Sequence, residues 1–559
     1  MAATDGLRFP LFVFAVFAAI AIFLAPDSAR AARPNIIVIQ TDDQSARTVK
    51  ANIRGRDGKF RKAMPHTVRQ IFNGGTEFRN YYATAPVCSP SRASLLTGQY
   101  PHSHGLTGNE GARGGWQGMK NLPIFNRNLA VSLDRSGYRT AHFGKLINGY
   151  YDSERGRVDT TVPPGWDRWF TTAFLPGTRY YGYEVNDDGF AAGPFGNPDY
   201  GYRGPGIDPK KCTKETLVTP RRGIKCRYLT DVMTRGVVKE IRQKGPRPLY
   251  IQVDYQGPHG DVIAPNGPQP ATRHLDSASR TPLPRGANFN EADMSDKSKL
   301  IRGYTNNPLG GGKIRKLTKS YRKTLESLRA VDDGVGAIIK TLRKTGQLDN
   351  TYIFYLSDHG YFLGEHRFDI AKFLPYDASA KVAMAVRGPG VPKGFDSREV
   401  TGNIDIAATA LSLAGVSSNY RVDGRSLKPF WRDPFRTSRR PVEISLLNLA
   451  GAEDNPGKAS VSNKAPALRY RGFRVGPYKY FDFVAGGSEL YDLARDPQEM
   501  NNVIDSPKYE TVRQYMETWM PQVTNCSGSG CRQALPVWPQ PYERRKFAVR
   551  TASIAPPAS

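Results

Sequence analysis

Several common features are missing from this sequence, and each absence narrows what the protein can be. The chain shows no internal repeat and no nucleic-acid-binding motif, and its basic residues are scattered rather than gathered in one arm. After residue 24 no apolar run approaches the roughly 20 residues that a membrane-spanning helix needs. We therefore expect no repeat array, no nucleic-acid partner and no membrane span in the body of the chain.

Acidic residues are scarce relative to basic ones. The chain has 51 Asp and Glu residues and 79 Lys and Arg residues, which gives a net charge of +28. Such a charge favours a polyanionic partner such as a sulfated glycan or an anionic envelope, and a diffuse charge that only aids solubility is the alternative. With 559 residues, of which 39% are hydrophobic, the chain is long enough for one large α/β domain and a smaller one.

Residues 1–31 have the form of an export signal. Arg8 precedes an apolar run over residues 9–24, and Ala29-Arg-Ala31 has the small-x-small pattern of a cleavage site. We expect an exported protein, secreted, periplasmic or associated with the cell envelope, without stable membrane insertion once the signal is cleaved. An uncleaved anchor is the alternative.

Cysteine is rare, with five in the chain, and export places them in an oxidising compartment. Cys526 and Cys531 enclose a tight Gly-rich loop, and Cys212 and Cys226 bracket another short polar loop, so we expect a disulfide in each. Cys88 is then left without a partner, which calls for a chemical explanation.

Cys88 opens the stretch Cys88-Ser-Pro-Ser-Arg-Ala-Ser-Leu-Leu-Thr-Gly98, which predicts a loop that turns into a helix. Ser89 suits the N-cap, Pro90 suits the first turn, and Gly98 can end the helix. Cys88 would then lie at the positive end of the helix dipole with Arg92 about one turn on, an arrangement that suits a tetrahedral oxyanion. A buried cysteine without a chemical role is the alternative for this stretch taken alone.

Charged side chains follow four predicted buried strands. They are Asp42 and Asp43 after residues 34–41, Lys145 after 138–143, His259 after 248–254, and Asp358 and His359 after 350–356. Open α/β sheets build their sites at the carboxyl ends of the strands, and carboxylates are the ligands that Ca²⁺ and Mg²⁺ prefer. Any one of these residues alone is more often a turn, a cap or a structural group, but their repeated position favours a common metal-containing site.

The segment Cys88-Ser-Pro-Ser-Arg92 resembles the Cys-x-Pro-x-Arg signature of the type I sulfatases, and the following Ala-Ser-Leu-Leu-Thr-Gly matches as well. Ser357-Asp-His-Gly360 and the segment 489–502 are similar to further family motifs in the same order, so the resemblance covers roughly residues 34–505. It implies an alkaline-phosphatase-like α/β sandwich, with a large central mixed, mostly parallel sheet flanked by helices and a smaller C-terminal antiparallel-sheet subdomain. In that family a separate formylglycine-generating enzyme oxidises the cysteine to Cα-formylglycine, whose hydrate is the nucleophile.

The resemblance also implies roles for single residues. The implied ligands of Ca²⁺, or alternatively Mg²⁺, are Asp42, Asp43, Cys88, Asp358 and His359, with sulfate contact as the alternative for His359. The implied catalytic residues are Cys88, Arg92, Lys145, His259 and Lys372, and the implied substrate-binding residues are Lys145, Asn148, His259 and Lys372. His259 would bind the sulfate or give a proton to the departing oxygen, and Arg92 would hold the nucleophile in place.

The sequence departs from the commonest family pattern at Ile147, where many relatives have a histidine. Gly144-Lys-Leu-Ile-Asn148 instead resembles the glucosamine-6-sulfatase branch. His142 is expected to point elsewhere because of strand alternation, and Glu365 and His366 are interpreted as rim or structural residues.

The remaining organisation is less sharply marked. The loop-rich, aromatic residues 150–227 are interpreted as an insertion over the mouth of the site, and residues 260–313 as another rim segment. We expect a signal at 1–31, a catalytic domain at 32–425, a C-terminal subdomain at 426–525 and a Pro-rich tail at 526–559.

Together the motifs predict hydrolysis of a sulfate ester, either an aryl sulfate or a 6-O-sulfated amino sugar or glycan. They look most like N-acetylglucosamine-6-sulfatases and bacterial arylsulfatases. A phosphodiester or phosphonate monoester hydrolase on the same scaffold is one alternative, although many of these use Ser or Thr as the nucleophile. An exported basic protein that binds acidic glycans without catalysis is the other.

Overall fold

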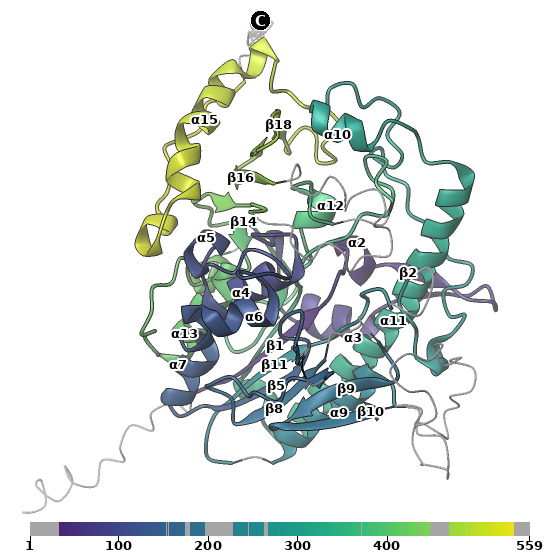
Figure 1. The fold of residues 1–559 in the computed structure, drawn as a ribbon, viewed down its shortest axis with the longest axis vertical. Helices are drawn as coiled ribbons and strands as arrows, with labels where there is room; N and C mark the ends of the chain where they lie inside the picture. The colour runs from purple at the N-terminus through teal and green to yellow at the C-terminus, as the bar shows by residue number, and fades with distance from the viewer. Residues whose placement is uncertain are drawn as a thin grey trace, which may run out of the picture.

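The computed structural model describes residues 33–541 except 153, 155, 174–178, 196–226, 244, 262–266, 370–371, 434 and 448–468. The predicted signal at 1–31, the Cys212–Cys226 pair and the end of the Pro-rich tail lie outside the described residues. None of the described helices is long and apolar enough to cross a membrane. Figure 1 shows a large α/β part with the C-terminal elements β16, β18 and α15 at its top.

A ten-stranded sheet forms the centre of the protein, in the order β10-β9-β8-β5-β11-β1-β12-β13-β4-β14. The pairs β10–β9, β9–β8, β12–β13 and β13–β4 are antiparallel and the remaining pairs are parallel, which confirms the mixed, mostly parallel sheet. The strands are β1 (Asn35–Thr41), β4 (Thr76–Tyr82), β5 (Arg139–Gly144), β8 (Arg168–Thr172), β9 (Tyr183–Asp187), β10 (Phe190–Phe195), β11 (Leu249–Asp254), β12 (Thr351–Ser357), β13 (Ala385–Arg387) and β14 (Phe395–Gly402).

β1 lies in the middle of the sheet because its residues are apolar toward both faces. It pairs in parallel with β11 and β12, and all of its residues are buried. Ile37 and Ile39 belong to the core on one face, and Ile36 and Val38 to the core on the other. An apolar run without alternation is typical of a strand covered on both sides.

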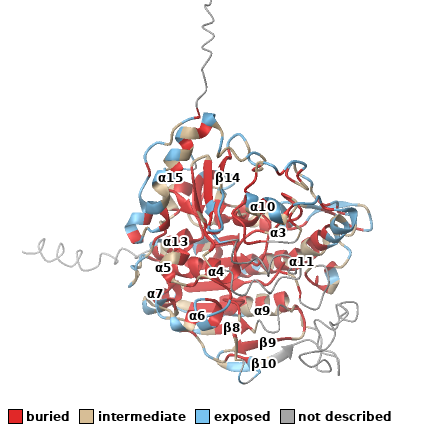
Figure 2. Ribbon diagram, turned by 45° about the horizontal axis from the view of Figure 1, so that its top comes forward, coloured by how far each residue is buried: buried red, intermediate tan, exposed pale blue. Residues whose placement is uncertain are grey.

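Helices cover both faces of the sheet, and buried residues concentrate between the layers (Figure 2). α9 and α11 contribute to the core that contains Ile37, whereas α4, α7 and α13 contribute to the core that contains Ile36. Their bounds are α4 (Cys88–Thr97), α7 (Leu129–Arg135), α9 (Leu229–Arg242), α11 (Gly311–Lys344) and α13 (Ile404–Ala414). The shorter elements are α2 (Ala46–Val49), β2 (Asn52–Arg54), β3 (Phe60–Lys62), α3 (Pro65–Thr67), α5 (Pro101–His104), α6 (Gly115–Asn121), η2 (Pro123–Phe125), β6 (Tyr151–Asp152), β7 (Arg157–Val158), α10 (Lys299–Tyr304), α12 (Asp377–Ala380) and α14 (Lys428–Arg432).

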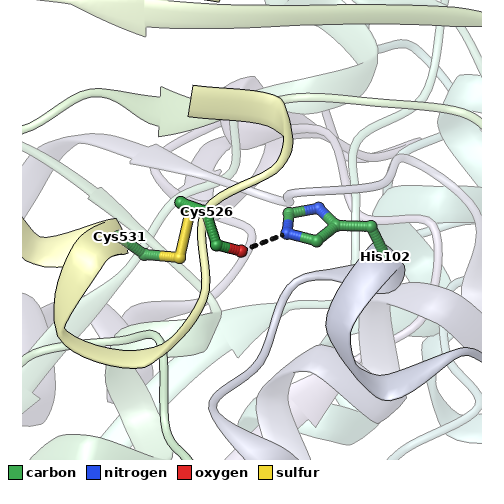
Figure 3. Close-up of side chains that lie close together, drawn as sticks. All are labelled: His102, Cys526 and Cys531. Carbon is green, nitrogen blue, oxygen red and sulfur yellow. Dashed lines mark hydrogen bonds between the residues drawn. A yellow bond between two sulfur atoms is a disulfide. The ribbon is translucent and has the colours of Figure 1, made fainter. Parts of the chain in front are cut away.

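A second, antiparallel sheet of four strands follows near the C-terminus, as predicted. It consists of β15 (Val442–Glu443), β16 (Tyr470–Val475), β17 (Tyr478–Phe483) and β18 (Ser488–Asp492), and α15 (Glu510–Thr524) packs on it. The predicted Cys526–Cys531 disulfide is present. It lies against α5, where the ring Nε2 of His102 is 2.8 Å from the carbonyl oxygen of Cys526 (Figure 3).

Part of the predicted insertion over the site mouth belongs to the sheet instead. β8, β9 and β10 extend the edge of the sheet beyond β5 within the segment interpreted as loop-rich. These strands are short and lie among Gly and Pro residues, so their pairing depends on the neighbouring strand rather than on a strong local pattern. β14 was not predicted. Residues 64–72 have an amphipathic pattern that is typical of one helix, and they form α3 followed by a π-helical turn at Val68–Phe72.

Candidate active site

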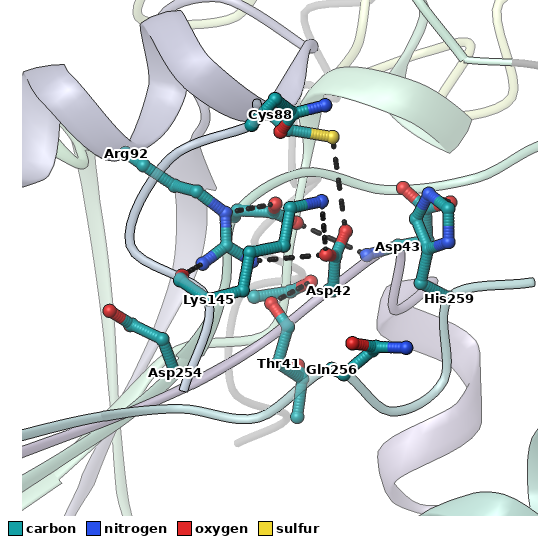
Figure 4. Close-up of polar contacts among 12 residues, drawn as sticks. Thr41, Asp42, Asp43, Cys88, Arg92, Lys145, Asp254, Gln256 and His259 are labelled. Carbon is teal, nitrogen blue, oxygen red and sulfur yellow. Dashed lines mark hydrogen bonds and ion pairs between the residues drawn. The ribbon is translucent and has the colours of Figure 1, made fainter. Parts of the chain in front are cut away.

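Four adjacent strands end at one edge of the sheet and bring the predicted side chains together. In the order β5, β11, β1 and β12, these strands are parallel. The chain continues from their ends into Lys145, His259, the pair Asp42 and Asp43, and the pair Asp358 and His359. Figure 4 shows contacts from Cys88, Arg92 and Lys145 meeting at Asp42.

α4 carries Cys88 to this edge, but the helix begins earlier than the sequence predicts. Cys88 is its first residue and the preceding residue is the N-cap, so Ser89 is not the cap. The Ser89 hydroxyl instead accepts a hydrogen bond from the backbone N–H of Asn148 at 3.2 Å, and the Ser89 N–H donates to Asn109 Oδ1 at 2.9 Å. Gly98 ends the helix with φ 68°, as predicted.

Arg92 lies one turn along α4, and its guanidinium is buried between three strand ends. Its Nε donates to Asp358 Oδ2 at 2.9 Å, its Nη2 lies 3.3 Å from Asp42 Oδ2, and its Nη1 donates to the carbonyl oxygen of Lys145. The side chain therefore joins the helix that begins at Cys88 to the ends of β12, β1 and β5.

Asp42, Asp43, Cys88 and His359 form a buried cluster whose ligand atoms all lie within 4.8 Å of one another. His359 Nε2 is 3.4 Å from both Asp43 Oδ1 and Cys88 Sγ. Its Nδ1 is 3.0 Å from the carbonyl oxygen of Gly360, and that acceptor assigns the proton of a neutral ring to Nδ1 and the lone pair to Nε2. Two carboxylates and an imidazole are a donor set that fits a divalent cation.

Asp358 lies beside this cluster rather than within it. Its Oδ1 accepts hydrogen bonds from the backbone N–H groups of Asp43 at 3.1 Å and of His359 at 2.9 Å. Its Oδ2 accepts from Arg92 and lies 3.7 Å from His359 Nε2. The carboxylate thus orients two residues of the cluster, and Oδ2 is the oxygen nearer to the imidazole.

Two lysines contact the cluster, one at each of its aspartates. Lys145 Nζ donates to Asp42 Oδ2 at 2.7 Å, and Lys372 Nζ donates to Asp43 Oδ1 at 2.8 Å and lies 3.2 Å from Cys88 Sγ. Burial alone would raise the pKa of both carboxyls, but neighbouring cations, led by Lys145 at Asp42 and by Lys372 at Asp43, lower the pKa of each. Burial alone would lower the pKa of Lys372, but Asp43 and Cys88 raise it well above the ordinary value. The site therefore combines anions that suit a metal with cations that suit an anionic substrate.

The two histidines of the site differ in charge preference. His259 Nδ1 is 2.8 Å from the carbonyl oxygen of Gly260, and its Nε2 lies 3.6 Å from Asp43 Oδ2. Burial lowers the pKa of His259, against the opposing effect of Asp43 and Asp42. Burial also opposes the charge of His359, but Asp358 outweighs it and raises the pKa of His359 to about 9. The cluster around His359 thus attracts positive charge.

Asn148 lies at the start of α4, where its backbone N–H meets Ser89. Its Oδ1 is buried and makes no hydrogen bond to any residue that the structure describes. The polar contact predicted for Asn148 near the site stays a prediction.

The residues set aside on sequence grounds lie in structural contacts. His142 Nε2 is 3.0 Å from Asp254 Oδ2, His366 Nδ1 is 2.5 Å from Glu291 Oε2, and Glu365 accepts the N–H of Leu363. Sequence reasoning missed Asn109, which holds the first turn of α4, and Asp254, whose charge acts on Arg92. Asp254 carries the same signal as Asp42, an acid at the end of a buried strand, whereas nothing local marks Asn109.

The sequence matches the family described as Sulfatase over residues 34–416. An extracellular sulfatase SULF-1 homolog of Drosophila melanogaster is 31% identical over 474 residues, which cover 83% of this chain but 37% of that protein. The chain thus spans little more than a third of that relative. N-acetylglucosamine-6-sulfatase of Homo sapiens is 28% identical over 525 residues, covering 89% of this chain and 86% of the relative.

Solved structures share the fold, among them the following two. One, of a protein in complex with its substrate D-glucosamine-2-N,6-O-disulfate, has a TM-score of 0.64 at 24% identity and covers 89% of this chain and 98% of its own. The phosphonate monoester hydrolase of Agrobacterium radiobacter has a TM-score of 0.60 at 21% identity and covers 89% of this chain and 96% of its own. These likenesses confirm the predicted alkaline-phosphatase-like fold.

Proposed function

The chain belongs to the sulfatase family, and on that basis we propose that it hydrolyses sulfate esters at residue 88. The supporting observation is the position of Cys88 Sγ, 3.2 Å from Lys372 Nζ and 3.4 Å from His359 Nε2, beside the acid cluster. A nucleophile at this point would meet an anionic sulfuryl group between two ammonium groups, those of Lys145 and Lys372.

We infer that Cys88 is the precursor of the nucleophile rather than the nucleophile itself. Among the cysteines that the structure describes, Cys526 and Cys531 share a disulfide and Cys88 is free and buried. Conversion of Cys88 by a formylglycine-generating enzyme would supply an aldehyde hydrate whose hydroxyl attacks sulfur. The first turn of α4 supports this position, because backbone N–H groups and the helix dipole favour an oxyanion there.

We propose that Asp42, Asp43, Asp358 and His359, together with residue 88, hold one Ca²⁺, with Mg²⁺ as the alternative. A bound ion there would supply positive charge to the sulfate oxygens and to the nucleophile. His359 can ligate only through a neutral Nε2, so binding of the cation would release the proton that the surrounding carboxylates favour. Asp358 already fixes the orientation of Asp43 and His359 through backbone hydrogen bonds.

The other residues of the site would bind substrate and move a proton. Lys145 and Lys372 would bind the sulfuryl oxygens, and the carboxylates that hold their ammonium groups fix them before substrate arrives. His259 presents Nε2 toward the cluster while Gly260 holds Nδ1, a geometry that suits proton transfer to the departing oxygen. Asn148 Oδ1 would accept a hydrogen bond from the sugar or aglycone.

For the physiological substrate we propose a 6-O-sulfated amino sugar or glycan, with aryl sulfates cleaved as simpler esters. The human relative that matches along most of its length is an N-acetylglucosamine-6-sulfatase. One structure with the same fold contains D-glucosamine-2-N,6-O-disulfate. An extracellular relative also supports the proposal that residues 1–31 direct export.

A phosphonate or phosphodiester hydrolase is the second candidate, because the phosphonate monoester hydrolase shares the fold at a TM-score of 0.60. Both reactions need a metal, cationic clamps and a buried nucleophile, so the two differ in the preferred ester. A glycan-binding protein without catalysis is the third candidate, and it needs no reactive residue 88.

The decisive experiment compares p-nitrophenyl sulfate with p-nitrophenyl phosphate, alongside mass spectrometry of the peptide that contains residue 88. We expect formylglycine at residue 88, a preference for sulfate, and loss of turnover in Cys88→Ala. Cys531→Ala is the matched control and should retain turnover, because that cysteine lies in the disulfide far along the chain. An unmodified cysteine together with a phosphate preference would overturn the proposal, and turnover that survives Cys88→Ala would contradict the role of residue 88.

A further inference from the structure

A pocket of about 860 Å³ lies at the opposite end of α4 from Cys88. Its walls come from Gln99 after α4, from η2, from residues 418–421 after α13 and from Ser527 in the disulfide loop. α4 has ten residues, and a helix of that length spans about 15 Å. The pocket is therefore separate from the site at Cys88.

The pocket carries positive charge that no acidic side chain in its walls offsets. Arg127 and Arg421 line it, and neither Asp nor Glu is among the described residues that do so. Neither guanidinium forms an ion pair within the described part of the chain, and Arg421 Nη1 donates to Ser527 Oγ at 3.1 Å. His104 also lines the pocket but adds no charge near neutral pH, because burial lowers its pKa to about 3.

A second pocket, of about 710 Å³ between α10 and the C-terminal sheet, shows the contrast. Its basic residues are accompanied by acids in the same walls, namely Asp296, Asp505 and Glu517. Lys297 Nζ lies 2.9 Å from Asp296 Oδ2, and Arg513 Nη1 lies 2.9 Å from Glu517 Oε1. Its charges therefore offset one another, whereas those of the pocket beyond α4 remain available to an anion.

The uncharged groups of the pocket beyond α4 suit a carbohydrate. Asn419 and Ser418 offer amide and hydroxyl groups, and Tyr420 offers an aromatic ring. The hydroxyls of Tyr420 and Ser103 are buried and make no hydrogen bond to any described residue. The two guanidinium groups can each bind a sulfate or carboxylate with paired N–H donors. The volume falls within the roughly 300–1,000 Å³ range of ligand sites.

We propose that this pocket, the α4 exosite, binds a sulfated oligosaccharide segment and thereby holds the protein on a glycan polymer. The inference rests on the proposed function for its choice of ligand, since a sulfatase meets sulfated sugars. Binding at the exosite leaves the site at Cys88 free to act on another sulfate group.

The test is titration calorimetry of the full chain, in its Cys88→Ala form, with a heparin octasaccharide. Arg127→Gln/Arg421→Gln should remove one binding event or weaken it at least about tenfold, because each arginine supplies charged hydrogen bonds. Arg302→Gln/Arg513→Gln is the matched control. It removes the same charge from the other pocket and should change binding less than about twofold, because acids in the same walls offset the charges there.

Equal weakening by both double variants would overturn the exosite in favour of diffuse charge, as would an unchanged isotherm for the Arg127 and Arg421 pair. Inorganic sulfate that binds as tightly as the octasaccharide would also overturn it, as would a neutral dextran oligosaccharide that binds equally well. p-Nitrophenyl sulfate turnover by the chain that retains Cys88 separates the two proposals. The exosite variant should keep that turnover. If the proposed function is wrong, the unsubstituted chain will show no turnover of p-nitrophenyl sulfate, and the binding result will still stand.

Discussion

Replacement of Arg92 by lysine tests how the active-site edge is held together. The guanidinium reaches Asp358, Asp42 and the carbonyl oxygen of Lys145, which follow three different strands. An ammonium group is a single nitrogen on a flexible stem and can contact one of these acceptors in place of three. Each charged hydrogen bond that is lost removes about 1.5–3 kcal/mol. We therefore expect the free energy of unfolding to fall by about 3–5 kcal/mol, the range for a broken buried pair.

Urea unfolding monitored by tryptophan fluorescence measures the change in stability. Arg471→Lys is the matched control, because its guanidinium contacts only Thr524 Oγ1 at 3.5 Å and the exposed Asn525 among described side chains. Its effect should stay within about 0.5 kcal/mol. Turnover of p-nitrophenyl sulfate by Arg92→Lys should fall about 100-fold, since a shift of about 1 Å in the nucleophile has that effect. The rate is normalised to the converted fraction of residue 88. A stability loss no larger than that of the control, with turnover retained, would refute the joining role of Arg92.

Three further substitutions and one metal-removal experiment test other parts of the structure. Lys372→Met should lower kcat for p-nitrophenyl sulfate about 10²–10³-fold by removing one preorganised cation, and a kcat within threefold of the unsubstituted chain would exclude that role. Cys526→Ser/Cys531→Ser should reduce the free energy of unfolding by about 2 kcal/mol, because the disulfide no longer restricts the entropy of this short loop in the unfolded chain. Turnover should stay unchanged. Chemical denaturation measures the stability, and no loss of stability would contradict the prediction. Arg440→Met should destabilise the fold by about 3–5 kcal/mol, because it leaves the buried Asp405 carboxylate without its charged partner. The oxygens of Asp405 accept hydrogen bonds from both Nη groups of Arg440 at 2.7 and 2.6 Å. An unchanged thermal unfolding temperature would count against this prediction. Removal of divalent cations by EDTA should abolish turnover and added Ca²⁺ should restore it, whereas activity that persists in the chelator would speak against a metal.

The elements that sequence analysis predicts well are those with a strong pattern over many residues. β1 is an uninterrupted apolar run. Residues 316–345 have apolar positions at helical spacing, and the structure has α11 there at Gly311–Lys344. β8, β9 and β10 have no comparable local pattern, because they are short and their positions depend on pairing at the sheet edge. Tertiary context decides such strands more than composition does.

The residues of the site also fall into two groups. Some are predicted by their position after a strand in the sequence, and others are found only from contacts in the folded structure. The position of acids and bases after consecutive parallel strands predicts that Asp42, Lys145 and His359 meet, since the strand ends share one edge. The start of α4 could not be predicted in this way. Ser89 has the right chemistry for an N-cap, but its hydroxyl is engaged by Asn148 and the turn is held by Asn109 from elsewhere in the chain.

The central position of β1 has a consequence for the timing of biosynthesis. Asn35 at its start contacts Leu249, 214 residues later, and Thr351, 316 residues later. At ribosomal rates of about 5–20 residues per second, β1 waits roughly 15–60 s for its second neighbour. Throughout that interval at least one edge of an apolar strand stays unpaired, and Cys88, whose surroundings include the end of β12, stays accessible. Translation speed therefore sets an aggregation risk and, under the proposed conversion of Cys88, the time available for a maturation enzyme to reach a residue that the finished fold encloses.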